Sequence, residues 1–248
     1  FSNVAFFRDF GGSGSDVETV TLSRSGAYLL LVEGSRFDGG SGSYTFNVQP
    51  VEDGTGALVV GELVSGAIDE VGEQDRYSFT LASSVRVYFD AFTNNANFNW
   101  TLVSPAGTVV GGRPFTSSDS HDIGNPVLSL GAGSYTLTAD ANGDVRGPYQ
   151  FRLLDLSTAT PITPGTAVSG ELNPANETDL YRFDVAAGDK FSFDAQARSG
   201  AGSAQWRLLD PFSNVIFFRD YGGTGSDVET MTLSRSGAYL LLVEGSRF

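Results

Sequence analysis

Residues 63–81 read LVSGAIDEVGEQDRYSFTL, and residues 167–185 read AVSGELNPANETDLYRFDV, which is the same pattern 104 residues later. In the first copy Tyr77, Phe79 and Leu81 alternate with polar residues, and this period of two predicts a half-buried β-strand. Further alternating runs follow, separated by turn clusters rich in glycine, asparagine and proline. Strands spaced this way in units of about 105 residues predict an all-β chain of tandem antiparallel β-sandwiches, jelly-roll or immunoglobulin-like in type.

A second repeat in the chain is almost exact. Residues 1–37 recur at 212–248 with only four substitutions, so the chain has a long period of 211 residues that contains two short ones. Near-identity of this kind indicates a recent duplication or an array whose repeats are kept uniform. We therefore expect two related domain types, called B and C here, that alternate along a longer chain.

The two periods together predict the domain boundaries. Residues 1–53 are expected to be the C-terminal half of a type-C sandwich, closed by a strand at Ser43–Val48. Residues 54–157 are expected to form a complete type-B sandwich, and residues 158–248 a type-C sandwich that lacks its last strand. The chain would then be a segment of a longer periodic protein, although an arbitrary excerpt would have the same ends. The last strand would come from the same polypeptide, which is the simpler explanation, or from another chain as a donated strand.

Two further patterns bear on the core. Leu29–Val32 and Leu240–Val243 are continuous apolar runs, which predict a central strand buried on both faces rather than a short helix. Trp100 and Trp206 occupy equivalent places in the two units and are expected to be core aromatics, with a ligand-stacking platform as the alternative.

The composition excludes several classes of protein. The 248 residues include no cysteine and a single histidine, His121, which excludes a disulfide framework, a cysteine-ligated metal and a multi-histidine metal site. A net charge of −14 and a pI near 4.3 argue against nucleic acid as a partner, because phosphates attract basic surfaces. No apolar run reaches the roughly 18 residues of a membrane span in this segment.

The order of the motifs resembles the bacterial pre-peptidase C-terminal domain. That order is VSG, then E-x-D-x-Y-x-F, then W-x-L-x-x-P, then G-x-Y, then a final Y-x-F. The residues that carry the first two motifs are Val64, Ser65, Gly66, Glu73, Asp75, Tyr77 and Phe79 in type B, and Val168, Ser169, Gly170, Glu177, Asp179, Tyr181 and Phe183 in type C. The resemblance implies a secreted bacterial β-sandwich of a kind found beside exported peptidases and in long surface proteins, some relatives of which bind calcium or insoluble polymer. This chain departs from that setting, because the domain is arrayed with itself and no peptidase is expected within these 248 residues.

Acidic residues gather near one loop of each unit. The candidates for binding Ca²⁺ in these loops are Asp69, Glu70, Glu73 and Asp75 in type B and Glu171, Glu177 and Asp179 in type C. Ca²⁺ takes six to eight oxygen ligands, so three or more carboxylates close together would suit it. The alternative is that these side chains cap the turn before a strand and keep it soluble.

Two other motifs have weaker chemical meaning. Gly222–Thr230 resembles one calcium-binding nonapeptide, with Asp227 and Glu229 as candidate ligands, but nothing repeats at nine residues and we expect a glycine-rich hairpin or loop. Ser120, His121 and Asp122 are adjacent in sequence, whereas a catalytic triad needs proximity in space, so a polar loop is expected there.

The leading functional interpretation is structural. Residues 1–37 carry a charge of −1, so the remaining 211-residue period carries −13, and like-charged units along an array resist collapse. We expect a non-catalytic segment of a secreted, extracellular or cell-surface protein from a bacterium, in contact with neighbouring repeats of its own chain or with identical chains. The alternative is a secreted binding module for polysaccharide or matrix polymer, with Phe6, Phe7 and Phe10 as exposed aromatic contacts.

Overall fold

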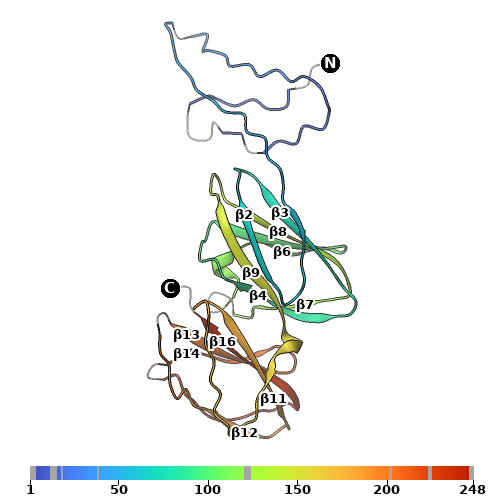
Figure 1. Cartoon of the computed structure of the whole chain (residues 1–248), viewed down its shortest axis with the longest axis vertical. Coiled ribbons are helices and arrows are strands. Elements are labelled where there is room, and N and C mark those ends of the chain that lie inside the picture. Colours follow the sequence, from blue (N-terminus) through green and yellow to red (C-terminus); the bar gives the residue numbers. More distant parts are fainter. Residues whose placement is uncertain are drawn as a thin grey trace.

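The computed structural model describes residues 4–11, 16–17, 19–37, 39–119, 124–200, 203–222 and 225–245. Apart from the short 3₁₀ turns η1 (Phe115–Ser117) and η3 (Leu156–Thr158), all regular structure in this part of the chain is β. Figure 1 shows two β-sandwiches in tandem, preceded by a long segment without strands. The all-β, tandem sandwich class predicted from the alternating pattern is therefore confirmed.

The first sandwich has two complete sheets. Its strands are β1 (Thr55–Ala57), β2 (Leu63–Ile68), β3 (Gln74–Leu81), β4 (Val85–Ala91), β5 (Phe98–Ser104), β6 (Gly107–Pro114), β7 (Val127–Leu130), β8 (Gly133–Ala141) and β9 (Gly147–Asp155). One sheet has the order β1-β3-β8-β5-β6 and the other β2-β9-β4-β7. Their facing side chains enclose a core in which the Phe89 and Trp100 rings stack with centroids 4.1 Å apart. Trp100 is fully buried, as expected of a core aromatic.

The second sandwich repeats one of these sheets. Its strands are β10 (Thr160–Pro161), β11 (Thr178–Val185), β12 (Lys190–Phe193), β13 (Ala204–Leu209), β14 (Val215–Tyr221), β15 (Val228–Thr232) and β16 (Gly237–Gly245). The five-stranded sheet, β10-β11-β16-β13-β14, matches that of the first sandwich strand for strand. The opposing sheet contains only β12 and β15, among the described residues, in the positions of β4 and β7. Trp206 is buried in this core as Trp100 is in the first.

One pairing in each sandwich departs from the antiparallel prediction. β1 pairs with β3, and β10 with β11, in the parallel sense. A parallel pair needs a crossover connection. In the first sandwich β2 supplies it, because β2 lies between β1 and β3 in the chain but belongs to the other sheet. The alternating sequence pattern does not distinguish the two directions, so this feature was not predicted.

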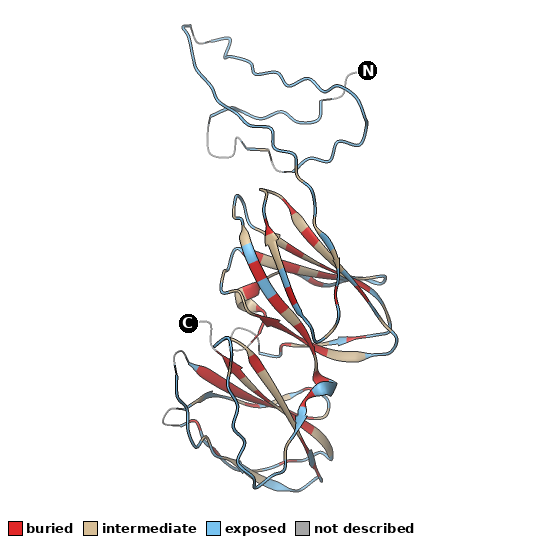
Figure 2. Cartoon of the chain, viewed as in Figure 1, coloured by how far each residue is buried: buried red, intermediate tan, exposed pale blue. Residues whose placement is uncertain are grey.

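The near-identical repeat adopts two different states. The copy in the second sandwich contributes β14, β15 and β16, whereas the described residues before Thr55 form no strand, including the stretch expected at Ser43–Val48. Leu240 is 3% exposed and its equivalent Leu29 is 89% exposed. Figure 2 shows the N-terminal segment exposed along most of its length. The prediction of a doubly buried strand thus holds for Leu240–Val243 and fails for Leu29–Val32.

The reason for this difference lies in the neighbouring strands. β16 pairs with β11 on one side and β13 on the other, so its backbone hydrogen bonds are made and both its faces are covered. Residues 29–32 have no such neighbours in the described part of the chain. The same apolar sequence therefore forms a strand only where neighbouring strands pair with it.

Candidate functional site

The most extensively built feature outside the two cores is the joint between the sandwiches. Side chains on the outer face of β4 and of the end of β9 meet side chains on the outer face of β13 and β16. Successive residues are therefore buried in the second part of β4 and throughout β13, and Figure 2 shows these stretches in red. The buried residues of this joint are Tyr88, Leu154, Leu156 and Ala159 from the first sandwich and its linker, and Leu209, Leu240 and Leu242 from the second. The two sandwiches therefore share a small hydrophobic core of their own.

A buried polar cluster lies inside the joint. The Tyr88 hydroxyl donates a hydrogen bond to Glu244 Oε1 at 2.8 Å, and Arg207 Nε donates to Glu244 Oε2 at 3.1 Å. The Arg207 and Glu244 side chains are almost completely inaccessible to solvent. Arg207 also donates to the carbonyl of Gly124 at 2.8 Å, which is on the first sandwich. Burial, and then the nearby Glu244 carboxylate, raises the pKa of Tyr88 well above its ordinary value, so this hydroxyl remains a donor.

A second charged cluster spans the joint on β9. Arg152 Nη2 lies 2.7 Å from Asp90 Oδ2 on β4 and 3.2 Å from Glu177 Oε1 of the second sandwich. Burial raises the pKa of Asp90 to about 7, although Arg152 acts in the opposite direction. Asn176 Nδ2 donates to the carbonyl of Ala91 at 2.9 Å, which adds a direct link between the sandwiches.

The rim of the joint is closed by further hydrogen bonds. Arg86 donates to the carbonyl of Pro211 and to the hydroxyl of Ser213, both at 3.0 Å. Asn125 Nδ2 donates to the carbonyl of Ser213 at 2.8 Å. Apolar contacts, charged groups and rim hydrogen bonds thus all connect the same two surfaces. Together they hold the two sandwiches in one relative orientation.

Sequence reasoning missed most of these joint residues. Its one usable signal was a break in alternation, because Leu153-Leu154 and Leu208-Leu209 place apolar side chains on both faces of a strand. The double burial predicted for Leu240–Val243 was the same signal, and the neighbouring sandwich is what covers the second face. Nothing in the pattern identified which charged residues would be buried opposite one another.

The candidate calcium ligands of the first sandwich have structural partners. The Glu73 carboxylate accepts hydrogen bonds from the backbone N–H groups of Asp69 at 2.6 Å and Glu70 at 2.9 Å, which caps the turn between β2 and β3. Asp75 accepts a hydrogen bond from the Tyr149 hydroxyl, which in turn lies 2.7 Å from the Tyr77 hydroxyl. Glu73 and Asp75 are buried, in agreement with the capping alternative.

The candidates of the second sandwich are dispersed. Glu177 belongs to the joint, and Asp179 accepts a hydrogen bond from Tyr181 at 3.3 Å. Burial, followed by the nearby Glu177 charge, raises the pKa of Asp179. Glu171 and Glu229 are exposed. No three acidic residues or histidines in the described ranges are grouped so that they could hold a metal ion, and calcium binding remains a prediction from the sequence.

Asp227 has a role that the sequence did not suggest. Its carboxylate accepts a hydrogen bond from the backbone N–H of Ala195 at 2.9 Å, just as Asp119 does from Ala91 at 2.6 Å in the first sandwich. The end of the Gly222–Thr230 motif belongs to β15, which begins at Val228, while residues 223 and 224 lie outside the described part of the chain. Ser120, His121 and Asp122 lie outside the described residues.

The VSG motif has a steric explanation. A Cβ atom at Gly66 would lie 2.5 Å from the Tyr77 hydroxyl and would also press against the Tyr149 hydroxyl. At Gly170 it would lie 2.6 Å from the Tyr181 hydroxyl. Glycine therefore leaves room for the tyrosine of the D-x-Y motif, which explains why the two motifs occur together.

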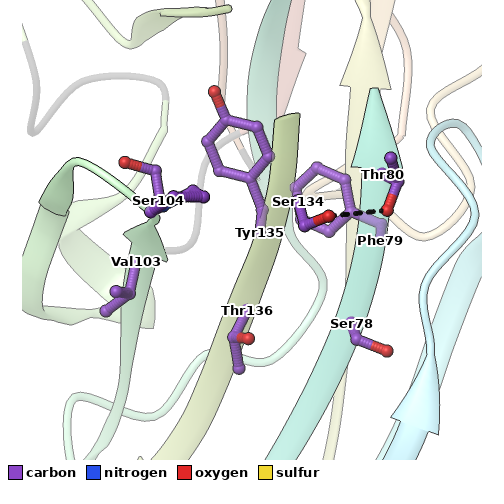
Figure 3. Close-up of a pocket in the computed structure, with 9 residues that line it drawn as sticks. Ser78, Phe79, Thr80, Val103, Ser104, Ser134, Tyr135 and Thr136 are labelled. Carbon is purple, nitrogen blue, oxygen red and sulfur yellow. Dashed lines mark hydrogen bonds between the residues drawn. The ribbon is translucent and has the colours of Figure 1, made fainter. Parts of the chain in front are cut away.

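The first sandwich also carries a shallow surface hollow. It has a volume of about 620 Å³ and lies over β3, β5 and β8, where hydroxyl groups predominate (Figure 3). Thr80 Oγ1 and Ser134 Oγ lie 3.1 Å apart at its floor. The neighbouring Phe79 and Tyr135 are largely buried, so they present little aromatic surface to a ligand.

These features define the class of protein: a tandem β-sandwich chain whose units carry motifs like those of the pre-peptidase C-terminal domain. No family model matches the chain, and no curated protein sequence matches it. Among solved structures, the chain is similar to the pre-peptidase C-terminal domain of collagenase from Bacillus anthracis. The identity is 17%, the TM-score is 0.31, and the match covers 43% of this chain and 99% of that domain.

The described part of the chain has no helix with the length and apolar character that a membrane crossing requires.

Proposed function

We propose that this chain is a non-catalytic structural segment of a long extracellular tandem-repeat protein, such as the stalk of an adhesin or the body of a surface filament or sheath. The observation that carries the proposal is the joint, which holds two sandwiches in one orientation through a shared core and two buried charged clusters. A protein whose task is to span distance needs such joints, because flexible linkers would let the array fold back on itself.

The buried apolar side chains of the joint favour contact between the two sandwiches. Each fully buried leucine or similar side chain contributes about 1.5–3 kcal/mol relative to an exposed one. The ion pair of Arg207 with Glu244 adds little net stability, because desolvation offsets most of its attraction. Both residues belong to the second sandwich, so the orientation depends instead on the bonds that cross the joint: Tyr88 to Glu244, Arg207 to the carbonyl of Gly124, and Arg152 to Glu177.

The charge and composition agree with an extracellular array. Each 211-residue period carries −13, so neighbouring periods repel one another and the array stays extended. The absence of cysteine makes the sandwiches independent of redox conditions. Partners would be neighbouring repeats, on the same chain or on identical chains.

The alternative is a secreted module that binds polysaccharide or a matrix polymer. Its support is the hydroxyl-lined hollow and the exposure of Phe7 and Phe10. However, Phe7 and Phe10 correspond to Phe218 and Tyr221 of β14, which are partly covered within the second sandwich. Their exposure goes with the lack of strands among the described residues before Thr55, so it is weak support for a ligand site, and the structural role is preferred.

Labelling of intact cells tests the proposal. Antibodies raised against the chain should decorate fibres or a surface layer by immunogold electron microscopy, without permeabilising the cells. Decoration that appears only after permeabilisation would contradict the extracellular role. A glycan array probed with the same chain tests the alternative, which requires saturable binding to at least one polysaccharide.

A further inference from the structure

The alternation of two sandwich types along the chain gives two kinds of joint. The structure describes the joint in which type B precedes type C, called the B–C joint here. The repeat also places type C before type B, and residues 49–54 are the linker of this second joint, called the C–B joint. Since the five-stranded sheets of the two types match strand for strand, each side chain of the B–C joint has an equivalent in the C–B joint.

The strand registers identify these equivalents. Trp100 pairs with Ala139 across β5 and β8, and Trp206 pairs with Val243 across β13 and β16. Residues of β8 therefore correspond to residues of β16, and residues of β5 to residues of β13. The face that type C turns towards a preceding type B can then be compared, position by position, with the face that type B would turn towards a preceding type C.

The apolar part of the B–C joint is not repeated on type B. On the five-stranded sheet of type C its buried members are Leu209, Leu240 and Leu242. Their equivalents on type B are Val103, Thr136 and Thr138. Two leucines are thus replaced by threonines, whose hydroxyl groups are costly to bury unless they find a partner. The type-B face is therefore suited to contact with water and not to a dry joint.

The hydroxyl-lined hollow lies on this same face. Val103 and Thr136 line it together with Thr80 and Ser134 (Figure 3). The Thr80 and Ser134 hydroxyls lie 3.1 Å apart and bond to each other. The concentration of small hydroxyl side chains leaves no large apolar side chain at the place where type C carries its leucines.

The charged cluster on β9 has no counterpart that could form. In the B–C joint Arg152 lies between two carboxylates, one on each sandwich. The three positions, Arg152, Asp90 and Glu177, correspond in the C–B joint to Asn47, Asp194 and Glu73. Two carboxylates would then face each other without a cation, and like charges repel. In addition, Glu73 already accepts hydrogen bonds from two backbone N–H groups of its own turn.

The second buried cluster is also lost. Its members in the B–C joint, Tyr88, Arg207 and Glu244, correspond to Ser192, Thr101 and Asp140. A serine hydroxyl lies next to the backbone and cannot reach across a joint as the tyrosine hydroxyl does. Asp140 instead accepts a hydrogen bond from Gln74 Nε2 at 2.8 Å within its own sandwich. This exchange removes the arginine and the tyrosine that hold the two sandwiches together.

A loop of type B adds contacts that type C is too short to make. Residues 115–126 connect β6 to β7, and they supply the Gly124 carbonyl to Arg207 and the Asn125 side chain to the Ser213 carbonyl. The corresponding connection in type C, between β14 and β15, is residues 222–227, which is half as long. A type-C sandwich therefore offers a following type-B sandwich a smaller rim.

The two linkers differ in the same direction. Residues 154–159 read LDLSTA, and both leucines and the alanine are buried in the B–C joint. Residues 49–54 read QPVEDG. Among the contacts of this second linker, Asp53 pairs with Arg76, and the backbone N–H of Glu52 donates to the Glu70 carboxylate at 3.2 Å. These contacts attach the end of the linker to type B only.

We propose that the joints of the array alternate, so that each B–C joint is rigid and each C–B joint is a hinge at residues 49–54. The rigid unit is then a pair of sandwiches, and the chain bends once in every 211-residue period. Relative motion is the usual behaviour of neighbouring domains that lack a large apolar interface. The charge of −13 on each period keeps the hinged pairs apart. This inference rests on the proposed role as a tandem-repeat segment and adds where such an array bends.

A longer chain contains both joints and tests the proposal. Because residues 212–248 repeat residues 1–37, appending residues 38–157 after Phe248 continues the repeat and gives the order B–C–B. Ala187→Cys labels type C, and Ser83→Cys labels either the first or the second copy of type B. Both positions are exposed and lie in equivalent turns, after β11 and after β3, and the chain has no other cysteine.

Double electron–electron resonance then compares the two joints with the same pair of residues. We expect a narrow distance distribution between Ala187→Cys and the first copy of Ser83→Cys, across the B–C joint. Across the C–B joint, to the second copy, we expect a distribution at least twice as wide. Equal widths, or a narrower distribution across the C–B joint, would overturn the proposal.

Exchanging residues between the faces tests the cause. Leu240→Thr with Leu242→Thr gives type C the residues of the type-B face, and both leucines lie outside the core of their own sandwich. We expect the B–C distribution to widen at least twofold. The control is Thr136→Val with Thr138→Val in the first type-B copy, on the sheet that the B–C joint does not use, and it should leave the width unchanged. A B–C width that the two threonines do not change would contradict the proposed basis of the rigid joint.

The outcomes for the hinge and for the extracellular role are separate. Equal widths in the spin-label comparison would remove the hinge and leave the extracellular role in place. Failure of the immunogold labelling of intact cells would remove that role, whereas the difference between the two joints would remain measurable in the purified chain.

Discussion

The Tyr88 hydroxyl of the first sandwich donates a hydrogen bond to Glu244 of the second, 2.8 Å away, and both side chains are completely buried. The two residues are separated by 156 positions in the sequence and belong to different sheets. Their contact connects β4 of the first sandwich directly to β16 of the second. It makes the orientation of the sandwiches part of the folded structure rather than a property of the linker.

Removal of this hydroxyl should weaken the joint. Tyr88→Phe takes one donor away from a buried carboxylate, and such a loss costs about 1–3 kcal/mol. We expect the urea unfolding midpoint to fall accordingly. Tyr28→Phe is the control, because Tyr28 is exposed and its hydroxyl donates to the nearby carbonyl of Arg24. Equal midpoints for both variants would show that the joint contributes nothing to stability.

Asp90 predicts a specific dependence of stability on pH. Its pKa is raised to about 7 by burial, so the folded protein retains a proton that the unfolded chain releases above about pH 4. The contribution of Asp90 to the free energy of unfolding is therefore fully present below about pH 4, and it is lost as the pH rises to 7.

Asp90→Asn removes this titration. We expect the free energy of unfolding of the variant, relative to the unmodified chain, to rise from pH 5 to pH 8, by at most a tenfold change in the folding equilibrium per pH unit. Asp184→Asn, at an exposed position, should show no such trend. A difference that stays constant over this range would mean that Asp90 is already ionised at pH 5.

Gly66 tests the steric explanation of the VSG motif. Gly66→Ala places a methyl group against the hydroxyls of Tyr77 and Tyr149, and such overpacking costs about 1–3 kcal/mol. Gly131→Ala, where no atom lies within 4 Å of the added Cβ, is the control. Thermal unfolding followed by tryptophan fluorescence should show a lower midpoint for Gly66→Ala alone. A larger loss for Gly131→Ala would refute the explanation.

Glu73 distinguishes a capping role from a calcium role. From the two backbone hydrogen bonds that it accepts, we expect Glu73→Gln to reduce stability by about 1 kcal/mol, equally in calcium and in chelator. Calorimetric melting in both solutions measures this. A calcium ion at the loop would instead raise the midpoint of the unmodified chain and leave the variant unaffected.

Most of the fold could be predicted from the alternation of apolar and polar residues. A strand that is buried on one face shows this alternation in its sequence, as Tyr77 and Phe79 do. The joint was harder to foresee, since Asp90 and Arg152 look like ordinary outward-facing residues until a second domain covers them. The sequence pattern could not predict that one copy of the repeat forms strands and the other does not. Leu29 and Leu240 stand in nearly identical sequences, and only the neighbouring strands separate an exposed residue from a buried one.

The central claim is that the joint holds the sandwiches in one orientation, and a distance distribution measures this most directly. Ser78→Cys and Asp184→Cys place spin labels at exposed positions on β3 and β11, in a chain with no other cysteine. Double electron–electron resonance should give a single narrow distance, which broadens when Tyr88→Phe and Leu154→Asp are added. A broad distribution in the otherwise unmodified chain would contradict a fixed joint, and with it the proposed role as a rigid repeating segment.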